Sequence, residues 1–169
     1  MIRLKNVKKD MGARVFLILL TVFFLSGVFH QVMSTRATQK ARIYVKDRQT
    51  GLLVSEKVII PNTRDKNEKL FWVLRELISG PAGGAYERIF NPNIEIQKVI
   101  IRGKVAYISF GWNLVESLHA EPNLVIRSIV NSALANIRGL KGVKILIDGI
   151  EPVSTFGGIS LLDTFRKPL

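Results

Sequence analysis

The first strong pattern along the chain is a long apolar run near its beginning. Residues 15–35 contain no charged side chain, and Arg14 and Arg36 close the run on its two sides. A helix of that length spans roughly 32 Å, about the thickness of a bilayer's hydrocarbon core. Its aliphatic and aromatic residues favour insertion by about 4 to 8 kcal/mol. We therefore predict a transmembrane span over residues 15–35, whose apolar residues include Val15, Phe23 and Phe29.

The flanks of this run decide its predicted orientation. Residues 1–14 are basic, with Asp10 as their single acid, and a short basic tail is retained in the cytoplasm. The opposite flank carries as many cations, so the cation count alone does not predict the orientation. We base the orientation on the tail, which is too short to be a folded domain. We expect a single-pass signal anchor in the cytoplasmic membrane, with the N-terminus inside and the folded part extracytoplasmic. The alternative is a cleaved signal peptide, for which small residues near the end of the run form only a weak cleavage site.

The pattern then changes to short alternating segments. Residues 36–41 are predicted as a polar stalk, followed by a strand over Ala41–Val45, a turn over Asp47–Gly51 and a second extended segment that ends at Pro61.

A helical period follows over Asp65–Ser79. Asp65 is the expected N-cap, and Glu68, three residues later, completes a capping box. Gly80 and Pro81 end this helix.

The second half of the domain repeats a strand-rich pattern. Ile94–Ile101 and Val105–Phe110 predict a hairpin with a tight turn at Arg102-Gly103. Further elements are a helix over Leu124–Ile137, a strand over 143–147 with an Asp148-Gly149 turn, and an edge strand over Thr155–Leu162. The order β-β-α-β-β-α-β over residues 42–169 predicts an α+β domain, a two-layer α/β sandwich behind the membrane helix.

Composition narrows the classes of function. The chain has 169 residues, no cysteine and a net charge of +12. The absence of cysteine excludes disulfides, thiolate metal sites and a lipidated cysteine. The basic excess favours acidic partners, such as anionic lipid, acidic wall polymer or an acidic protein. We expect no nucleic-acid binding, because the cations are scattered along the sequence without a recognised reader motif.

Candidate catalytic residues are few. The loop Gly80–Gly84 lacks the Lys and the Ser or Thr that a P-loop needs, so a helix cap is expected there. His119 alone builds no zinc site. A catalytic triad of His119 and Asp148 with Ser109 or Ser117 remains formally possible. Neither serine lies in a nucleophile-elbow pattern.

Acidic side chains offer the other route to catalysis. Glycoside cleavage needs two carboxyls roughly 5 to 10 Å apart, and the candidates are Glu116, Glu121, Asp148 and Glu151. No spacing in the sequence brings two of them together. We expect a protein without catalytic residues, metal or cofactor.

Exposed residues at loops are the expected contact points for a partner. Trp72 lies on a predicted helix beside Phe71 and is expected in the core, whereas Trp112 follows a strand end and is expected to be partly exposed. The predicted contact residues are Trp112, Gly83, Gly84, Arg102 and Lys104.

Motifs in the soluble part resemble a known family. They are Leu77–Pro81, Val105–Ser109 followed by Leu114, Ile129–Leu134, Gly142–Gly149 and Gly157–Leu162. In this order they are similar to the GerMN domain, an extracytoplasmic module named after a bacterial sporulation and germination protein. The chain departs from the family at Ile108, where an acid is frequent, at Ser132, where Thr is common, and in having one copy of the domain.

The resemblance implies a membrane-tethered, non-enzymatic domain that assembles with other envelope proteins or with itself. It implies a fold similar to the ring-building modules of secretion complexes, and it brings no catalytic residues. We thus expect an assembly role in a cell-envelope, sporulation or secretion-type complex. The alternative is a module that binds cell-wall glycan or another anionic polymer through Trp112 and scattered cations. An envelope hydrolase comes third.

Overall fold

The structure is a computed structural model that describes residues 37–80 and 83–166. Residues 1–14 and 15–35, the predicted tail and span with Val15, Phe23 and Phe29, lie outside the described residues. Within the described ranges, no helix has both the length and the apolarity needed to cross a bilayer. The anchor and its orientation therefore stay predictions.

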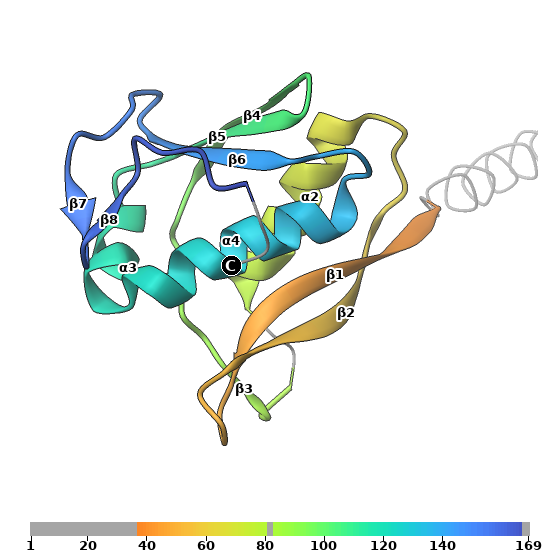
Figure 1. The fold of residues 1–169 in the computed structure, drawn as a ribbon. Coiled ribbons are helices and arrows are strands. Elements are labelled where there is room, and N and C mark those ends of the chain that lie inside the picture. Colours follow the sequence, from red (N-terminus) through yellow and green to blue (C-terminus); the bar gives the residue numbers. More distant parts are fainter. Residues whose placement is uncertain (1–36, 81–82, 167–169) are drawn as a thin grey trace, which may run out of the picture. The chain divides into compact units, whose positions relative to one another are not determined.

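The first hairpin joins β1 (Thr38–Asp47) to β2 (Leu53–Pro61) in antiparallel register (Figure 1). Asp47 fixes the predicted turn, because its Oδ1 accepts from the amides of Gln49 and Thr50 at 3.1 and 2.8 Å. β1 starts at Thr38, inside the segment 36–41 that was predicted as a stalk. Pairing with β2 therefore begins earlier than the apolar alternation suggested.

α2 (Lys66–Ser79) has the predicted bounds and the predicted N-cap. The Asp65 carboxylate accepts from the amide of Asn67 at 2.7 Å. The predicted capping box is wrong, because Glu68 accepts from the hydroxyl of Thr63, and that same hydroxyl also accepts from the Asp65 amide. The buried face is Leu70, Val73, Leu74, Leu77 and Ile78.

The second sheet consists of β4 (Ile96–Arg102), β5 (Val105–Phe110) and β6 (Gly142–Ile147) in that order. β4 and β5 form the predicted hairpin, and β6 adds parallel to β5. The hairpin turn is Gly103-Lys104, one residue later than predicted. Arg102 already pairs with Val105, and Gly103 has the positive φ of 59° that such a turn requires.

Two helices occupy the segment where the sequence predicted one. α3 (Leu114–Ala120) was missed, and α4 (Pro122–Asn136) starts two residues before the predicted Leu124. Pro122 explains the division, because proline lacks an N–H and suits the first position of a helix. It therefore begins α4 instead of extending α3.

Three short strands complete the described part. β3 (Tyr86–Glu87) adds to the end of β1, and β7 (Thr155–Phe156) and β8 (Ile159–Ser160) form a separate hairpin. The single edge strand predicted over 155–162 is therefore wrong. Gly157 and Gly158 both have positive φ and reverse the chain between the two strands.

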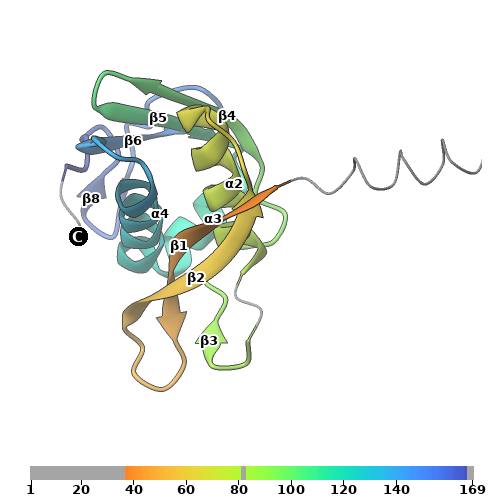
Figure 2. The same cartoon turned by 90° about the vertical axis from the view of Figure 1, so that its right-hand side faces the viewer.

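The α+β class is confirmed, but the two-layer arrangement is not. Helices α2 and α4 pack against each other, and each contacts strands of both three-stranded sheets. Figures 1 and 2 show the two helices between the β1–β2 hairpin and the β4–β5–β6 sheet. Among the described residues, the buried side chains of both three-stranded sheets and of α2, α3 and α4 form one hydrophobic core. The two predicted hairpins thus belong to different sheets.

Candidate functional site

The free edge of β1 is covered by a polar stripe on α4. Ser132 Oγ accepts from the Tyr44 amide at 2.9 Å, and the Ser128 hydroxyl donates to the Tyr44 carbonyl. One turn further, Asn136 accepts from the Arg42 amide at 2.9 Å and donates to the Arg42 carbonyl at 2.5 Å. Residues spaced by four lie on one helix face. This stripe replaces a neighbouring strand, and it holds the middle of β1 in a fixed position.

A groove of about 280 Å³ lies beside this contact, and its charged residues are all cations. Lys40 and Arg42 come from β1, Lys57 from β2 and Lys69 from α2. Ala41, Ala135 and Asn136 complete the lining. We call this feature the basic groove and define it by Lys40, Arg42, Lys57 and Lys69. None of the ion pairs found among the described residues includes any of these four cations.

The register of the hairpin brings two of these cations directly opposite each other. Arg42 pairs with Lys57 across β1 and β2. Because the backbone of Arg42 bonds to Asn136, this is a non-hydrogen-bonded strand pair, with Cα atoms about 4.5 Å apart and close side chains. Like charges in that position destabilise a sheet. The fold therefore keeps two like charges opposite each other at a position where such a pair is unfavourable.

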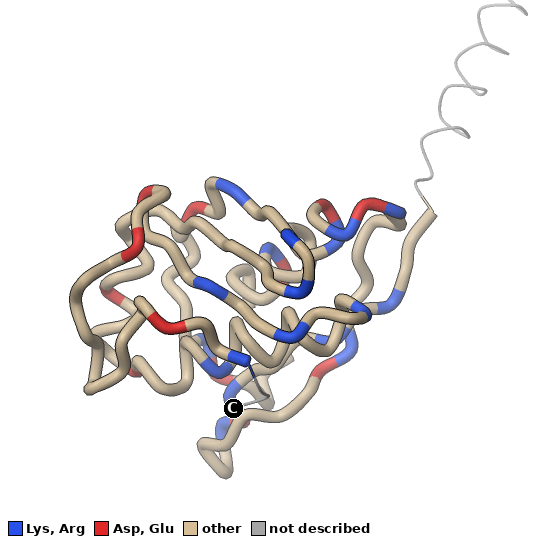
Figure 3. The backbone as a smooth tube through the Cα atoms, turned by 45° about the horizontal axis from the view of Figure 1, so that its top comes forward, with Lys and Arg blue, Asp and Glu red and all other residues tan. Residues whose placement is uncertain are grey.

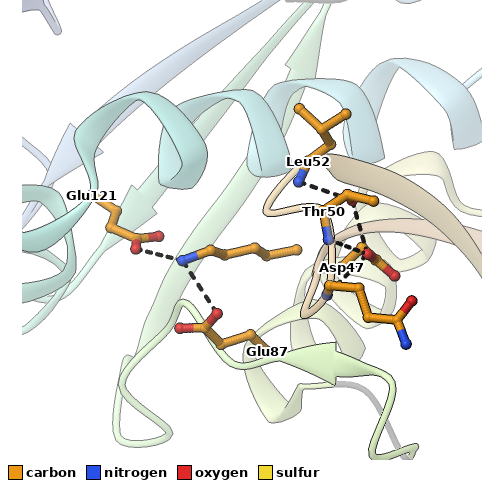
Figure 4. Close-up of polar contacts among 7 residues, drawn as sticks. Asp47, Thr50, Leu52, Glu87 and Glu121 are labelled. Carbon is orange, nitrogen blue, oxygen red and sulfur yellow. Dashed lines mark hydrogen bonds and ion pairs between the residues drawn. The ribbon is translucent and has the colours of Figure 1, made fainter.

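Another lysine of the same strand shows the ordinary solution. Lys46 Nζ pairs with Glu121 Oε1 at 2.7 Å and Glu87 Oε2 at 3.2 Å (Figure 4). The hydrogen bond to Glu121 holds the pKa of Lys46 above its usual value. In the adjoining turn, the Thr50 amide holds the pKa of Asp47 below its usual value. Acids thus neutralise the last cation of β1 but not Lys40 or Arg42.

Further cations surround the basic groove at one end of the domain. Lys66 Nζ donates to the Arg138 carbonyl at 3.5 Å, which joins the start of α2 to the end of α4. The Lys104 carbonyl accepts from the Lys141 amide at 2.7 Å, which joins the β4–β5 turn to the start of β6. We call this the basic end, formed by the basic groove with Arg64, Lys66, Arg102, Lys104, Arg138 and Lys141.

The acids of the domain are distributed differently. Asp65 and Glu68 lie near the basic end at the start of α2. In Figure 3, Asp and Glu lie mostly toward the left of the view, whereas Lys and Arg are more frequent toward the right, with a second group of Lys and Arg at the lower middle. The tertiary structure therefore collects cations that are dispersed along the sequence.

The opposite end of the second sheet exposes apolar side chains. Trp112 follows the end of β5, and Ile150 and Val153 follow the end of β6; they are 69%, 71% and 82% exposed. The two strand ends are held together, because the Asp148 amide donates to the Phe110 carbonyl at 2.8 Å. We call these three residues the apolar rim. Its exposure is typical of residues that anchor a protein contact.

The turn under the apolar rim is rigid. Asp148 and Gly149 have φ of 49° and 78°, and Ile147 and Ile150 exchange two backbone hydrogen bonds at 2.9 and 3.0 Å. These are the features of the tight two-residue hairpin turn predicted from Asp-Gly. The Ser109 hydroxyl accepts from the Gly149 amide at 2.8 Å and donates to Gln97, whose amide donates to Asp148. Ser109 and Asp148 are therefore linked through Gln97, as a brace for the turn.

The remaining candidates for catalysis have structural partners. The His119 ring packs edge-on against Phe156 at 5.3 Å, and Ser117 accepts from the Asn91 amide at 3.2 Å. The other candidate acids have separate partners: Glu116 with Asn91, Glu121 with Lys46, and Glu151 with Lys144. Among the described residues, no group of three His, Cys, Asp or Glu side chains is placed to hold a metal ion.

The predicted contact residues are not brought together. Trp112 lies beyond one end of β5, while Arg102 and Lys104 lie at the other end, about 20 Å away along a six-residue strand. Gly83 and Gly84 lie in the exposed loop before β3. Trp72 is half-buried, with Arg75 5.2 Å from its ring centre. Trp112 and the basic residues thus belong to two separate surfaces.

Sequence reasoning missed the residues that hold the basic groove in place. Ser128 and Ser132 are fully buried within α4, yet the helix was interpreted only through its apolar residues. The available signal was the spacing of four between Ser128, Ser132 and Asn136, which places three polar side chains on one face of the helix. The like-charged pair was not visible, because it depends on the register of β1 and β2.

The fold is similar to solved structures. The first GerMN domain of the sporulation protein GerM from Bacillus subtilis is 14% identical with a TM-score of 0.61, covering 76% of this chain and 98% of that one. The tandem GerMN domains of the same protein are 18% identical with a TM-score of 0.61, covering 80% of this chain and 48% of that one. At these identities the likeness shows the fold alone.

A weaker likeness joins the chain to a Clostridium perfringens protein assigned as a lipoprotein. It is 16% identical with a TM-score of 0.51, covering 78% of this chain and 89% of that one. No curated protein matches the chain. The family model called Germane, described as sporulation and spore germination, matches residues 42–153. The resemblance to GerMN domains is thereby confirmed, and the chain belongs to the Germane family.

Proposed function

We propose that this protein is a non-enzymatic, membrane-anchored envelope protein whose folded domain assembles with other envelope proteins or with itself. The observation on which this rests is the apolar rim. Trp112, Ile150 and Val153 expose most of their surface at one end of the β4–β5–β6 sheet, and backbone hydrogen bonds fix the turns at Trp112 and Ile150. An exposed aromatic on a rigid support has little conformational entropy to lose on binding. Family membership and the likeness to a sporulation protein support an envelope role.

The proposal places the domain outside the cytoplasmic membrane. It combines the predicted span over residues 15–35 with the likeness to a protein assigned as a lipoprotein, which suggests an envelope location. Protease treatment of intact spheroplasts tests the orientation. We expect digestion of the domain and survival of the short tail. Protection of residues 42–169 would reverse the orientation.

Site-specific crosslinking tests the assembly role. A photocrosslinking phenylalanine analogue at position 153 of the full chain, activated in intact membranes, is expected to give discrete protein adducts. Trp112→Ala should weaken these adducts at least tenfold, because a central aromatic contact contributes about 2 kcal/mol or more. The matched control is the same analogue at Leu52, which is 67% exposed on the β1–β2 turn. Equal adducts at both positions, or none at 153, would contradict the role of the apolar rim.

A further inference from the structure

The basic groove contains a charge arrangement that the fold itself does not need. Arg42 and Lys57 oppose each other across the hairpin, with Lys40 and Lys69 on the same groove and no ion pair to any of the four among the described residues. The backbone there is already satisfied by Asn136. Such repulsion is relieved when an anion enters the groove and pairs with several cations at once. The arrangement therefore fits a negatively charged ligand.

The surroundings of the groove indicate the shape of that ligand. The basic end gathers five element termini and one turn: the starts of β1, α2 and β6, the ends of β2 and α4, and the β4–β5 turn (Figure 1). Its outer cations, such as Arg102, Lys104 and Lys141, are exposed. A single small anion would engage only the groove. A broad surface that presents many phosphates would engage the whole end.

We propose that the basic end docks on a bilayer leaflet that contains anionic phospholipid, with headgroup phosphates entering the basic groove. This inference rests on the proposed membrane anchor. Lys40 follows residue 35, the last of the predicted span, by five residues, a distance of at most about 18 Å in an extended chain. Docking leaves the apolar rim, at the other end of β5, accessible to a protein partner.

The absence of cysteine allows a direct test with the full chain. Asn62→Cys places a single fluorescent label just after β2, and Val153→Cys places one at the apolar rim. Each labelled chain is reconstituted in nanodiscs made of phosphatidylcholine alone or with one third phosphatidylglycerol, both containing a headgroup-attached quencher. Co-purification with the discs reports the anchor, and quenching reports docking.

We expect the label at position 62 to be quenched only in discs with phosphatidylglycerol, and we expect 1 M salt to remove this quenching. The label at position 153 should show the same fluorescence in both kinds of disc. Arg42→Gln with Lys57→Gln should lower the ratio of docked to undocked domain roughly 30-fold. The matched control, Arg48→Gln with Arg127→Gln, removes two exposed cations away from the groove and should leave it unchanged.

Three results would overturn the proposal. The first is equal quenching in both lipids while the chain co-purifies with the discs. The second is equal loss in the two double variants. The third is quenching that does not depend on lipid charge, combined with a change in the fluorescence at position 62 when soluble polyphosphate is added. That result would assign the groove to a soluble anionic polymer. Failure of the chain to co-purify with discs would instead refute the anchor, so the two failures are distinguishable.

Discussion

Two surfaces of the domain, the basic end and the apolar rim, expose side chains that are unfavourable in different ways. At the basic end, Arg42 of β1 and Lys57 of β2 oppose each other without acidic partners among the described residues. Beyond the end of β5, the apolar rim keeps Trp112 and Val153 in water. At the basic end, α4 side chains bond to the backbone of Arg42 and Tyr44, and at the rim two backbone hydrogen bonds between Ile147 and Ile150 close the Asp148-Gly149 turn. In both places hydrogen bonds to the backbone hold residues that expose unfavourable side chains, Arg42 at the basic end and Ile150 at the rim.

The first expected effect comes from breaking the support of the basic end. Ser132→Val leaves the Tyr44 amide without its acceptor in a buried helix face and should cost about 2 kcal/mol of unfolding free energy. That corresponds to a melting temperature roughly 8 °C lower, measurable by circular dichroism of the full chain in detergent. Ser132→Thr is the control, because threonine has nearly the same shape as valine but retains the hydroxyl that accepts from the Tyr44 amide. Equal losses in both variants would show that packing, and not the hydrogen bond, matters at this position.

Hydrogen exchange on the same variant sharpens the comparison of the two ends. We expect Ser132→Val to speed exchange of the Arg42 and Tyr44 amides while the Ile150 amide at the rim keeps its protection. A uniform increase across the domain would mean that the two ends are not independent.

The second effect concerns the far end. A Cβ on Gly157 would lie 2.5 Å from Pro122 at the start of α4, whereas one on Gly158 meets nothing within 4 Å. Both glycines have positive φ, so both alanine variants pay backbone strain of about 1 kcal/mol. Gly157→Ala should cost about 1 to 3 kcal/mol more because of the clash. Chemical denaturation of the two variants measures the difference, and equal midpoints would contradict the close approach.

A smaller effect, an increase in the free energy of unfolding, tests whether the Arg42–Lys57 pair is repulsive in the folded domain. Lys57→Glu turns the pair with Arg42 from repulsive to attractive and should stabilise the domain by about 0.5 kcal/mol. The gain should disappear at 1 M salt, where surface charges are screened. The same variant should abolish docking on anionic lipid. Destabilisation by Lys57→Glu at low salt would argue that the two cations are already neutralised.

The smallest effect is a pH dependence at Glu56. This residue alternates with Lys57, so it faces the inner side of the hairpin, where burial raises the pKa of its carboxyl. Below its unfolded pKa of about 4.3 the group is neutral in both states. Stability should then fall as pH rises through the higher folded pKa, because a desolvated group must ionise. Glu56→Gln should remove this decline in unfolding free energy between pH 4 and 7, and an unchanged decline would exclude Glu56 as its source.

Much of the local structure was predictable because local chemistry determines it. Asp65 before an apolar helical period gave the start of α2, and Asp148-Gly149 gave a tight turn. α3 was missed because seven residues are too few to show a clear period. The capping-box prediction was wrong because Thr63 lies outside the four-residue motif. Its hydroxyl donates to the Glu68 carboxylate and accepts from the Asp65 amide, the two groups that the capping box would have joined.

The sequence alone determined the charge excess, the elements with clear periods, the hairpin partners close along the chain and the family. Only the tertiary structure decided that the two hairpins lie in different sheets, and that a polar stripe of α4 closes the edge of β1. It also decided that cations far apart in the sequence meet at one end while Trp112 lies at the other. The reason is physical: caps, turns and periods depend on neighbours a few residues away. Sheet membership and charge clustering depend on packing between segments separated by up to a hundred residues.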